Sequence, residues 1–158
     1  MATAAPIEVF LRRERIPYTT FHHPIAYSAQ EEAAASHIRG RAWAKTVACF
    51  IDAEPVLAVL PAPYDVDVEA LRALAGGQTA RLAREDEVAR LYPQCEVGAM
   101  SPLGPVYRQR VFVDRRLAAD TEIAFSAGTH ADAIRMQYAD FLDVTRPTLG
   151  AFAVPHRH

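Results

Sequence analysis

Hydrophobic residues along the chain switch between two periods, and these switches predict an alternation of helices and strands. Ile7, Phe10 and Leu11 fall at helical spacing, whereas residues 45–52 and 56–60 form short apolar runs typical of buried strands. The segment "AEP" between the two runs predicts an antiparallel hairpin with apolar residues on both faces, so other elements should cover it on each side. The same patterns predict further helices over 28–37, 67–75, 85–92 and 139–144, and further strands over 16–23, 79–83, 106–114 and 121–138, the last range being two strands joined by a turn.

Capping residues support the helices and lead to a fold class. Ser28 to Glu31 reads "SAQE", which matches a capping box, and Asp67 stands before the helical pattern that ends at two glycines. No repeat or interdomain linker interrupts the 158 residues, of which 51% are apolar. We therefore expect an α/β fold, with residues 1–158 as a single domain in which a mixed β-sheet is covered by helices, and residues 154–158 as a flexible tail.

Composition and charge exclude several classes of protein. A net charge of −2 and a pI near 6.3 argue against a protein that holds nucleic acid through bulk positive charge. The longest uncharged apolar run, residues 55–64, is far shorter than the roughly 20 residues of a membrane-spanning helix, and the N-terminus does not resemble a secretory signal. Of the two cysteines, Cys49 lies in an apolar strand pattern and is expected as a core thiol rather than half of a disulfide. These features predict a protein of the reducing cytoplasm.

One basic residue differs from all the others. Lys45 is the only lysine in the chain, since the other sixteen basic residues are arginine. An ammonium is a compact point charge on a narrow stem, whereas a guanidinium is a broad planar fork, so a retained lysine suggests a place where the fork does not fit. By strand alternation Lys45 shares a face with Val47, Cys49 and Ile51, which would put its stem against an apolar layer. The alternative is an ordinary lysine at a strand end that reaches into solvent.

A second candidate is the loop "GAMSP". Gly98 can adopt backbone angles closed to other residues, and Pro102 restricts both itself and Ser101. Between them Ala99, Met100 and Ser101 carry backbone N–H groups with no evident strand partner, so the loop could aim donors into a cleft. The alternative is a plain connection, because a glycine and a proline at this spacing are common in loops.

The histidines give weaker signals. His22 and His23 are adjacent, so in a strand they would face opposite sides; a shared metal is not expected, and His22 is retained as a residue that lines the pocket. His156 and His158 fall in the expected tail, and no metal or cofactor is predicted. Cys95 precedes "GAMSP" and is expected to be an unreactive loop thiol. No serine triad motif is present, so a covalent intermediate is not indicated.

The ordered set of motifs resembles the YbaK/EbsC family, the free-standing relatives of the editing domain of bacterial prolyl-tRNA synthetases. The motifs that carry the resemblance are "HP", "SAQEEAA", the strand that begins at Lys45, "GAMSPLG", "VFVD" and "SAG", and they span residues 21–143 in the family's order. Members hydrolyse the ester of mischarged aminoacyl-tRNA. By this resemblance Lys45 matches the catalytic lysine, Gly98 and Pro102 bound the family's substrate loop, and Ser126 and Gly128 match a turn that lines the pocket.

The resemblance implies that water attacks a positioned ester, with Lys45 orienting the substrate, the loop holding the aminoacyl group and a ribose hydroxyl of the substrate helping to activate the water. It implies the acceptor end of a mischarged tRNA as partner, with a synthetase as a second candidate partner. Two departures from the family pattern are Ser101, where many relatives have proline, and the turn "SAGTHAD", which leaves His130 and Asp132 as pocket candidates without assigned roles. A basic rim for the tRNA is expected from Arg12, Arg13, Arg15, Arg39 and Arg41.

Two other functions use the same pocket. One is a non-catalytic module that binds an aminoacyl or nucleotide ligand or docks on a synthetase, in which Lys45 serves affinity rather than turnover. The other is an esterase whose substrate is unrelated to tRNA.

Overall fold

The computed structural model describes residues 5–156 and is built around a five-stranded mixed sheet in the order β5-β2-β3-β6-β9. The hairpin of β2 and β3 forms its centre, β5 pairs antiparallel with β2, and β6 and β9 continue from β3 in parallel. The bounds of these strands are β2 (Ala44–Ile51), β3 (Glu54–Pro61), β5 (Ala80–Leu82), β6 (Val111–Asp114) and β9 (Thr148–Gly150). The expected mixed sheet in a single domain is confirmed.

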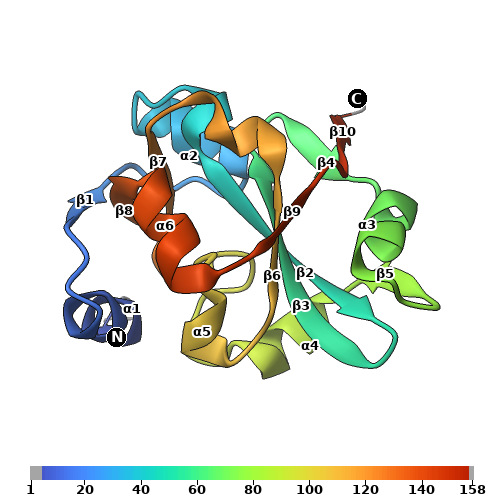
Figure 1. Cartoon of the computed structure of the whole chain (residues 1–158). Coiled ribbons are helices and arrows are strands. Elements are labelled where there is room, and N and C mark those ends of the chain that lie inside the picture. The colour runs from blue at the N-terminus through green and yellow to red at the C-terminus, as the bar shows by residue number, and fades with distance from the viewer. Residues whose placement is uncertain (1–4, 157–158) are drawn as a thin grey trace.

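Two smaller sheets flank the central one. A three-stranded antiparallel sheet has the order β1-β8-β7, with β1 (Tyr18–His22), β7 (Glu122–Ser126) and β8 (Asp132–Gln137). A second pair consists of β4 (Tyr64–Val66) and β10 (Ala153–Pro155). A single parallel bridge between Trp43 and Ala124 ties the start of β2 to β7. The strands thus divide among three sheets, and the start of β2 lies where all three approach one another (Figure 1).

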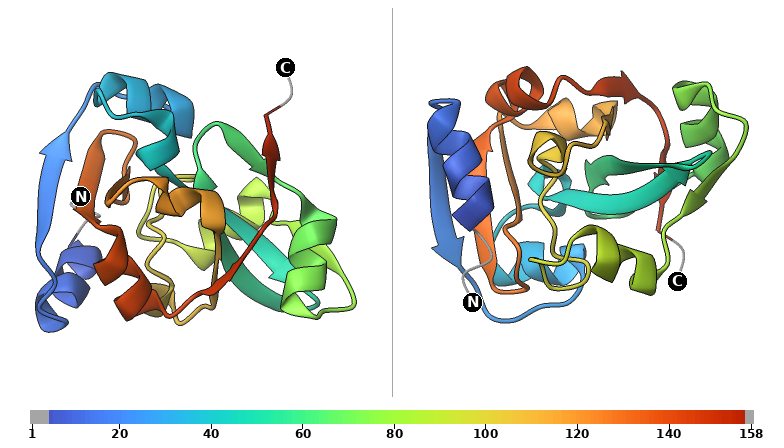
Figure 2. Two further views of the ribbon diagram at one scale, coloured as in Figure 1. Left: turned by 45° about the horizontal axis from the view of Figure 1, so that its top comes forward. Right: turned by 90° about the horizontal axis from the view of Figure 1, so that it is seen from below.

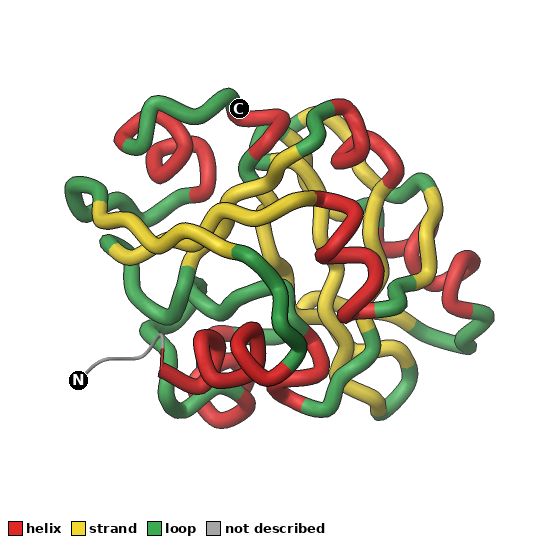
Figure 3. The backbone as a smooth tube through the Cα atoms, turned by 60° about the vertical axis from the view of Figure 1, so that its left-hand side comes forward, coloured by secondary structure: helices red, strands yellow, loops and turns green. Residues whose placement is uncertain are grey.

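The helices lie around the outside of the strands (Figure 3). In Figures 1 and 2, α1 lies beside the β1–β8 sheet and α3 lies at the opposite side of the molecule, beside β5. The helical segments are α1 (Ala5–Arg13), α2 (Ala29–Ala35), α3 (Val68–Ala75), α4 (Glu85–Leu91), α5 (Gly104–Tyr107), α6 (Tyr138–Thr145) and the 3-10 turns η1 (Gly40–Ala42) and η2 (Arg115–Ala119).

Both faces of the central hairpin are buried, as the sequence predicts. Along β3, Val56, Ala58 and Leu60 join the cluster beneath α3, which includes Leu71. Val59, on the opposite face, joins the cluster with α1 and α6. Full burial of such aliphatic side chains contributes about 1.5–3 kcal/mol each, so the hairpin is held from two sides and its ends are fixed in space.

The helix caps follow the sequence signals. The Ser28 hydroxyl accepts a bond from the Glu31 amide, and the Glu31 carboxylate accepts one from the Ser28 amide, which completes the capping box of α2. The Asp67 carboxylate accepts from the Ala70 amide at the start of α3, and Gly76 ends that helix with φ of +73°.

Two segments differ from the sequence prediction. Residues 106–114 are not one strand, because Pro105 near the start of α5 favours a helical turn and Arg108 ends it with φ of +58°, so β6 begins only at Val111. The expected tail from residue 154 is instead paired with β4 up to Pro155, and residues 157 and 158 lie outside the described residues. No helix within residues 5–156 is long and apolar enough to cross a membrane.

Candidate functional site

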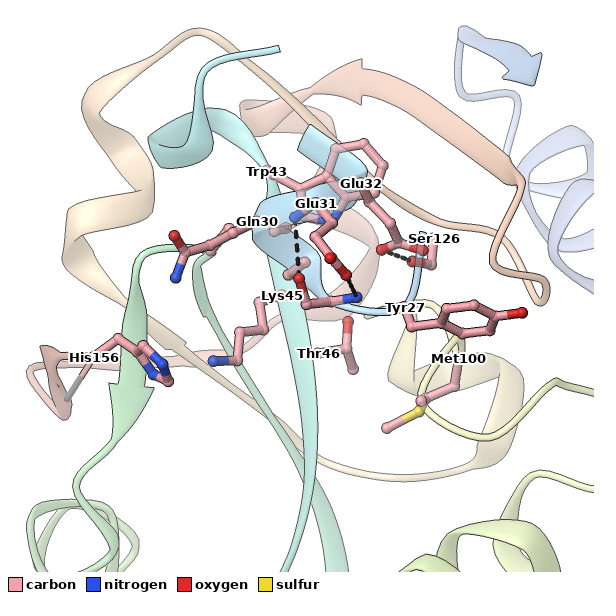
Figure 4. Close-up of a pocket in the computed structure, with 15 residues that line it drawn as sticks. Tyr27, Gln30, Glu31, Glu32, Trp43, Lys45, Thr46, Met100, Ser126 and His156 are labelled. Atoms are coloured by element: carbon pink, nitrogen blue, oxygen red, sulfur yellow. Dashed lines mark hydrogen bonds between the residues drawn. The ribbon is translucent and has the colours of Figure 1, made fainter. Parts of the chain in front are cut away.

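A cavity of about 600 Å³ opens where the three sheets meet (Figure 4). Its walls come from α2 and the residues before it, the start of β2, the loop after Val97, the end of β7 and the residue after β10. Of the residues singled out by sequence, the structure brings Lys45, Gly98, Met100 and Ser126 together in this wall. Segments that lie far apart in sequence, from Tyr27 to His156, therefore build one site.

Lys45 enters the cavity from the start of β2. It lies opposite Leu60 in the hairpin register and shares its face with Val47 and Cys49, so its stem runs along the apolar layer beneath α3. Its ammonium donates to the Tyr64 carbonyl at 2.8 Å and to the Asp65 carboxylate at 3.0 Å. An ammonium carries three N–H donors. The described residues accept two of them, so the third can bind a ligand oxygen.

Asp65 connects Lys45 to the end of the chain. One of its oxygens accepts from Lys45 and the other lies 2.8 Å from Nδ1 of His156. Desolvation alone would raise the pKa of Asp65, but the hydrogen bonds from Lys45 and His156 outweigh it and lower that pKa. Pairing of β10 with β4 brings His156 to the cavity, where the sequence pattern predicts only a tail. We call Lys45, Asp65 and His156 the lysine end.

The loop from Gly98 to Pro102 contributes only part of its length to the cavity. Gly98 has φ of +86°, the left-handed conformation that its sequence position suggests, and Gly98 and Met100 line the wall. The Ala99 amide donates to the Glu96 carbonyl. Ser101 is fully buried, with its amide and hydroxyl bonded to the Tyr107 hydroxyl, and Pro102 is buried beside it. The amides of Ala99 and Ser101 are therefore occupied, and the loop presents Gly98 and Met100.

The turn between β7 and β8 is bonded to this loop. The Gly128 amide donates to the Ala99 carbonyl at 2.8 Å, and the Gly128 carbonyl accepts from the Glu96 amide at 2.8 Å. Gly128 has φ of +97°, which explains the glycine at this turn. His130 lies behind Gly98, and its Nε2 is 2.9 Å from the Val97 carbonyl. Gly128 and His130 thus hold the loop rather than line the cavity.

His22 and Asp132 form a pair of their own. They lie opposite each other in the β1–β8 register, and Nδ1 of His22 contacts the Asp132 carboxylate. The His22 side chain is 87% exposed, and neither residue belongs to the cavity wall. The other Asp132 oxygen accepts from the Thr129 hydroxyl at 2.6 Å, which stabilises the turn.

Glu32 is a site residue that sequence reasoning missed. It lies one position beyond the capping glutamate of α2 and is 4% exposed. One carboxylate oxygen accepts from the Ser126 hydroxyl at 2.7 Å, whereas Oε1 has no hydrogen-bond partner among the described residues. Burial raises the pKa of Glu32 from 4.5 to about 7, and the bond from Ser126 opposes that rise only in part. In the sequence Glu32 follows Gln30 and Glu31 in the first turn of α2, where acidic residues are common, so its position gave no signal of a buried carboxylate.

His130 faces the same carboxyl group. Its Nδ1 lies 3.7 Å from Oε1 of Glu32, and that nitrogen is also buried without a hydrogen-bond partner among residues 5–156. Because the Val97 carbonyl can only accept, Nε2 of His130 carries a hydrogen. Glu32 and Ser126 line the cavity across from the lysine end (Figure 4), and His130 contacts Glu32 from outside the wall; we call these three residues the glutamate end.

Further lining residues also escaped the sequence patterns. Tyr27 is 75% exposed at the mouth, with its ring 5.0 Å from that of His130. Thr46 follows Lys45 on β2 and points to the same cavity as Met100, and Trp43 closes the wall near α2. Their positions depend on tertiary packing, for which the local sequence gives no signal.

The described residues offer neither an activated thiol nucleophile nor a cluster of metal ligands. Both cysteines are free, as expected; Cys49 is buried, which raises its pKa to about 12, and burial also raises the pKa of Cys95 despite a hydrogen bond with Tyr107. A raised pKa keeps a thiol protonated and weakly nucleophilic. Within residues 5–156 no group of three or more His, Cys, Asp or Glu side chains could hold a metal ion.

The arginines of the expected basic rim lie outside the cavity wall. Arg12 pairs with Glu8 on α1, and Arg41 pairs with Asp120 at 3.3 Å. None of the five arginines proposed from sequence belongs to the cavity wall, so any contact with an extended polyanion would lie outside it.

Comparisons with known proteins identify the family of the sequence and the likeness of the fold. The sequence profile of the aminoacyl-tRNA editing domain matches residues 23–144, a range that contains Lys45, Gly98 and Ser126. Among curated protein sequences, none matches the chain.

Three solved structures illustrate the likeness of the fold. A proposed trans-editing enzyme for prolyl tRNA synthetase superposes with a TM-score of 0.83 at 19% identity, and the match covers 98% of each chain. A hypothetical protein superposes with a TM-score of 0.84 at 19% identity over 94% of this chain and 99% of that one. A proposed signal transduction protein from Marinobacter aquaeolei VT8 has a TM-score of 0.72 at 19% identity over 95% of this chain but 30% of its own. At these identities the likeness shows the fold alone.

Proposed function

Because the sequence profile matches residues 23–144, the chain belongs to the aminoacyl-tRNA editing domain family, and from this premise we propose that it is a trans-editing hydrolase for mischarged aminoacyl-tRNA. The observation that carries the proposal is the meeting of Lys45 with Gly98 and Met100 in one cavity of about 600 Å³. If the ammonium lay far from the loop, the two could not contact one substrate, and the proposal would fail.

The reaction is the hydrolysis of the ester between the amino acid and the terminal ribose. Water adds to the ester carbonyl, the bond to the ribose oxygen breaks, that oxygen takes up a proton, and the products are a free amino acid and an uncharged tRNA. Lys45 would donate its remaining hydrogen to the substrate carbonyl or to the sugar–phosphate end, while Asp65 and the Tyr64 carbonyl hold the ammonium still. Gly98 and Met100 would bound the aminoacyl group.

The ion pair between Lys45 and Asp65 also favours a second candidate, a module that binds the same ligand without turnover. A paired ammonium can serve as an anchor for a ligand oxygen as well as a catalytic donor. The two functions differ in whether loss of Lys45 removes turnover or only weakens binding.

The test is a deacylation panel of tRNAs charged with alanine, serine, cysteine and proline, run with the wild type and with Lys45→Ala. We expect the wild type to release at least one of the four amino acids and the variant to release none above background. Bound but unhydrolysed substrate in the wild type would favour the binding module, and full activity of Lys45→Ala would contradict the assignment of Lys45.

A further inference from the structure

The glutamate end contains two buried polar atoms without hydrogen-bond partners. Oε1 of Glu32 and Nδ1 of His130 lie 3.7 Å apart, and neither has a hydrogen-bond partner among residues 5–156. A buried polar atom without a partner costs about 1–3 kcal/mol, and native proteins rarely retain one without a reason. Glu32 is 4% exposed and lines the cavity, so the reason can be a ligand.

The position of Glu32 indicates which part of a ligand would reach it. Ser126, whose hydroxyl holds one oxygen of Glu32, lines the cavity together with Gly98 and Met100, which bound the proposed aminoacyl pocket. Lys45, which would hold the ester or the sugar, lies across the cavity (Figure 4). The group that meets Glu32 therefore belongs to the amino acid rather than to the nucleic acid.

The charge of Glu32 selects among the donors that an amino acid can offer. A buried carboxylate is stable only when an opposite charge or a proton compensates it. A side-chain hydroxyl could donate a hydrogen bond but would leave the negative charge uncompensated. The α-ammonium group supplies both a hydrogen bond and a positive charge, and every aminoacyl ester with a free amine carries one.

On the basis of the proposed function, we propose that Glu32, with one oxygen fixed by Ser126, binds the α-ammonium group of the aminoacyl ester and restricts the cavity to esters with a free amine. Glu32 is thereby a substrate-binding residue that sets specificity and takes no part in breaking the ester bond. The raised pKa fits this role, because a carboxyl group that is readily protonated at neutral pH exchanges its proton for the ammonium of the substrate.

The experiment compares free and N-acetylated forms of whichever aminoacyl-tRNA the wild type hydrolyses best. Acetylation removes the charge of the amine while leaving the ester in place. Each rate is divided by the uncatalysed rate of the same ester, since acetylation also changes its intrinsic lability. We expect kcat/KM of the wild type to be about 10- to 100-fold higher for the free amine, which corresponds to the loss of one hydrogen bond to a charged group.

Glu32→Gln tests the carboxylate itself. The amide oxygen can still accept from Ser126, so the fold should be preserved, while kcat/KM for the free amine should fall about 10- to 100-fold and that for the acetylated ester should be unchanged. Glu122→Gln is the matched control, because Glu122 is an exposed carboxylate on the strand that carries Ser126, and it should keep the wild-type preference.

The outcomes separate this inference from the proposed function. Hydrolysis of both esters by the wild type at equal normalised rates, or an unchanged preference in Glu32→Gln, would overturn the role of Glu32 while leaving the deacylase intact. A preference that follows serine over alanine and ignores acetylation would overturn it in favour of side-chain recognition. Absence of hydrolysis with every ester would instead overturn the proposed function. The wild-type comparison remains decisive even if Glu32→Gln does not fold.

Discussion

The two ends of the cavity treat charge in opposite ways. At the lysine end the ammonium of Lys45 is held by Asp65 and the Tyr64 carbonyl, with both contacts at 3.0 Å or less. At the glutamate end, Oε1 of Glu32 and Nδ1 of His130 are buried without hydrogen-bond partners in the described part of the chain. A charge that is already paired is held in position before a ligand binds. A buried polar atom without a partner gains a hydrogen bond when the ligand binds, so its binding free energy is larger.

Under the proposed function, this difference would let one cavity separate catalysis at Lys45 from recognition at Glu32. The lysine end is partly open, with the Lys45 side chain 26% exposed, and its charge is compensated before any substrate arrives. The glutamate end is buried, with Glu32 4% and Ser126 7% exposed, so each hydrogen bond made there is stronger than the same bond in water. Substitutions can change the charge at one end while leaving the other end intact.

The largest effect is expected at the lysine end. Lys45→Ala should lower kcat of deacylation by about 10²–10³, the usual cost of removing one donor to a developing oxyanion. Lys45→Arg should also be poor, because the guanidinium fork cannot occupy the space of the ammonium beside Tyr64 and Asp65. Single-turnover deacylation measures the loss, and circular dichroism should show an intact fold; an active arginine variant would show that any cation suffices.

The glutamate end should be detected in the dependence of stability on pH. Because burial raises the pKa of Glu32 to about 7, the folded state holds a proton that the unfolded chain releases near pH 4.5. Folding stability therefore falls as pH rises from about 4.5 to about 7 and stays lower above that range. Glu32→Gln cannot ionise, so it should be more stable than the wild type at pH 8 by about 1–3 kcal/mol.

Urea unfolding of both proteins at pH 5 and pH 8 measures this difference. The gap in the free energy of unfolding should be small at pH 5 and should widen toward pH 8. His130 is the titratable group that faces Glu32, with its Nδ1 3.7 Å from Oε1. A gap that stays constant with pH would contradict a buried, ionisable Glu32.

A smaller effect is expected from the partner of Lys45. Asp65→Asn leaves the ammonium bonded to the Tyr64 carbonyl but removes the ion pair, so Lys45 should become more mobile and kcat/KM should fall about 10-fold. Stability should change by less than about 1 kcal/mol, since the pair is partly exposed. Asp120→Asn, which removes the exposed partner of Arg41, is the control and should leave deacylation unchanged.

The smallest effect concerns the loop between the two ends. Gly98→Ala places a side chain in a left-handed conformation at φ of +86° and should cost about 1 kcal/mol of stability. Gly76→Ala carries the same strain at φ of +73°, with no atom within 4 Å of the added carbon, and lies far from the cavity at the end of α3. Both variants should lose similar stability in thermal unfolding, while only Gly98→Ala should slow deacylation.

The sequence predicted part of each end of the cavity: Lys45 at one and Ser126 at the other line the wall, whereas His156 and Glu32 were missed. Lys45 could be found because it is the only lysine, and Gly98 because a glycine and a proline bound its loop. The alternation that placed Lys45 on the face of Val47 and Cys49 is confirmed by their common cluster and register. Strand period, capping and turn residues are local properties, so the main elements of the fold followed from them.

Glu32 and His156 could not be predicted, for two different physical reasons. The capping box explains Glu31, and whether its neighbour Glu32 is buried depends on the packing of α2 beside β7, which no local pattern encodes. His156 reaches the cavity because β10 pairs with β4, about ninety residues earlier in the chain. The roles assigned to Lys45, Gly98 and Ser126 by the family resemblance remain predictions until the kinetics are measured.

The solitary lysine also makes the cavity directly observable. If lysine alone is labelled with ¹⁵N at Nζ, the protein gives one labelled side-chain resonance, and that resonance arises from the ammonium beside Asp65. Its chemical shift would report the occupancy of the site by any molecule, reactive or not, without assignment of the rest of the spectrum.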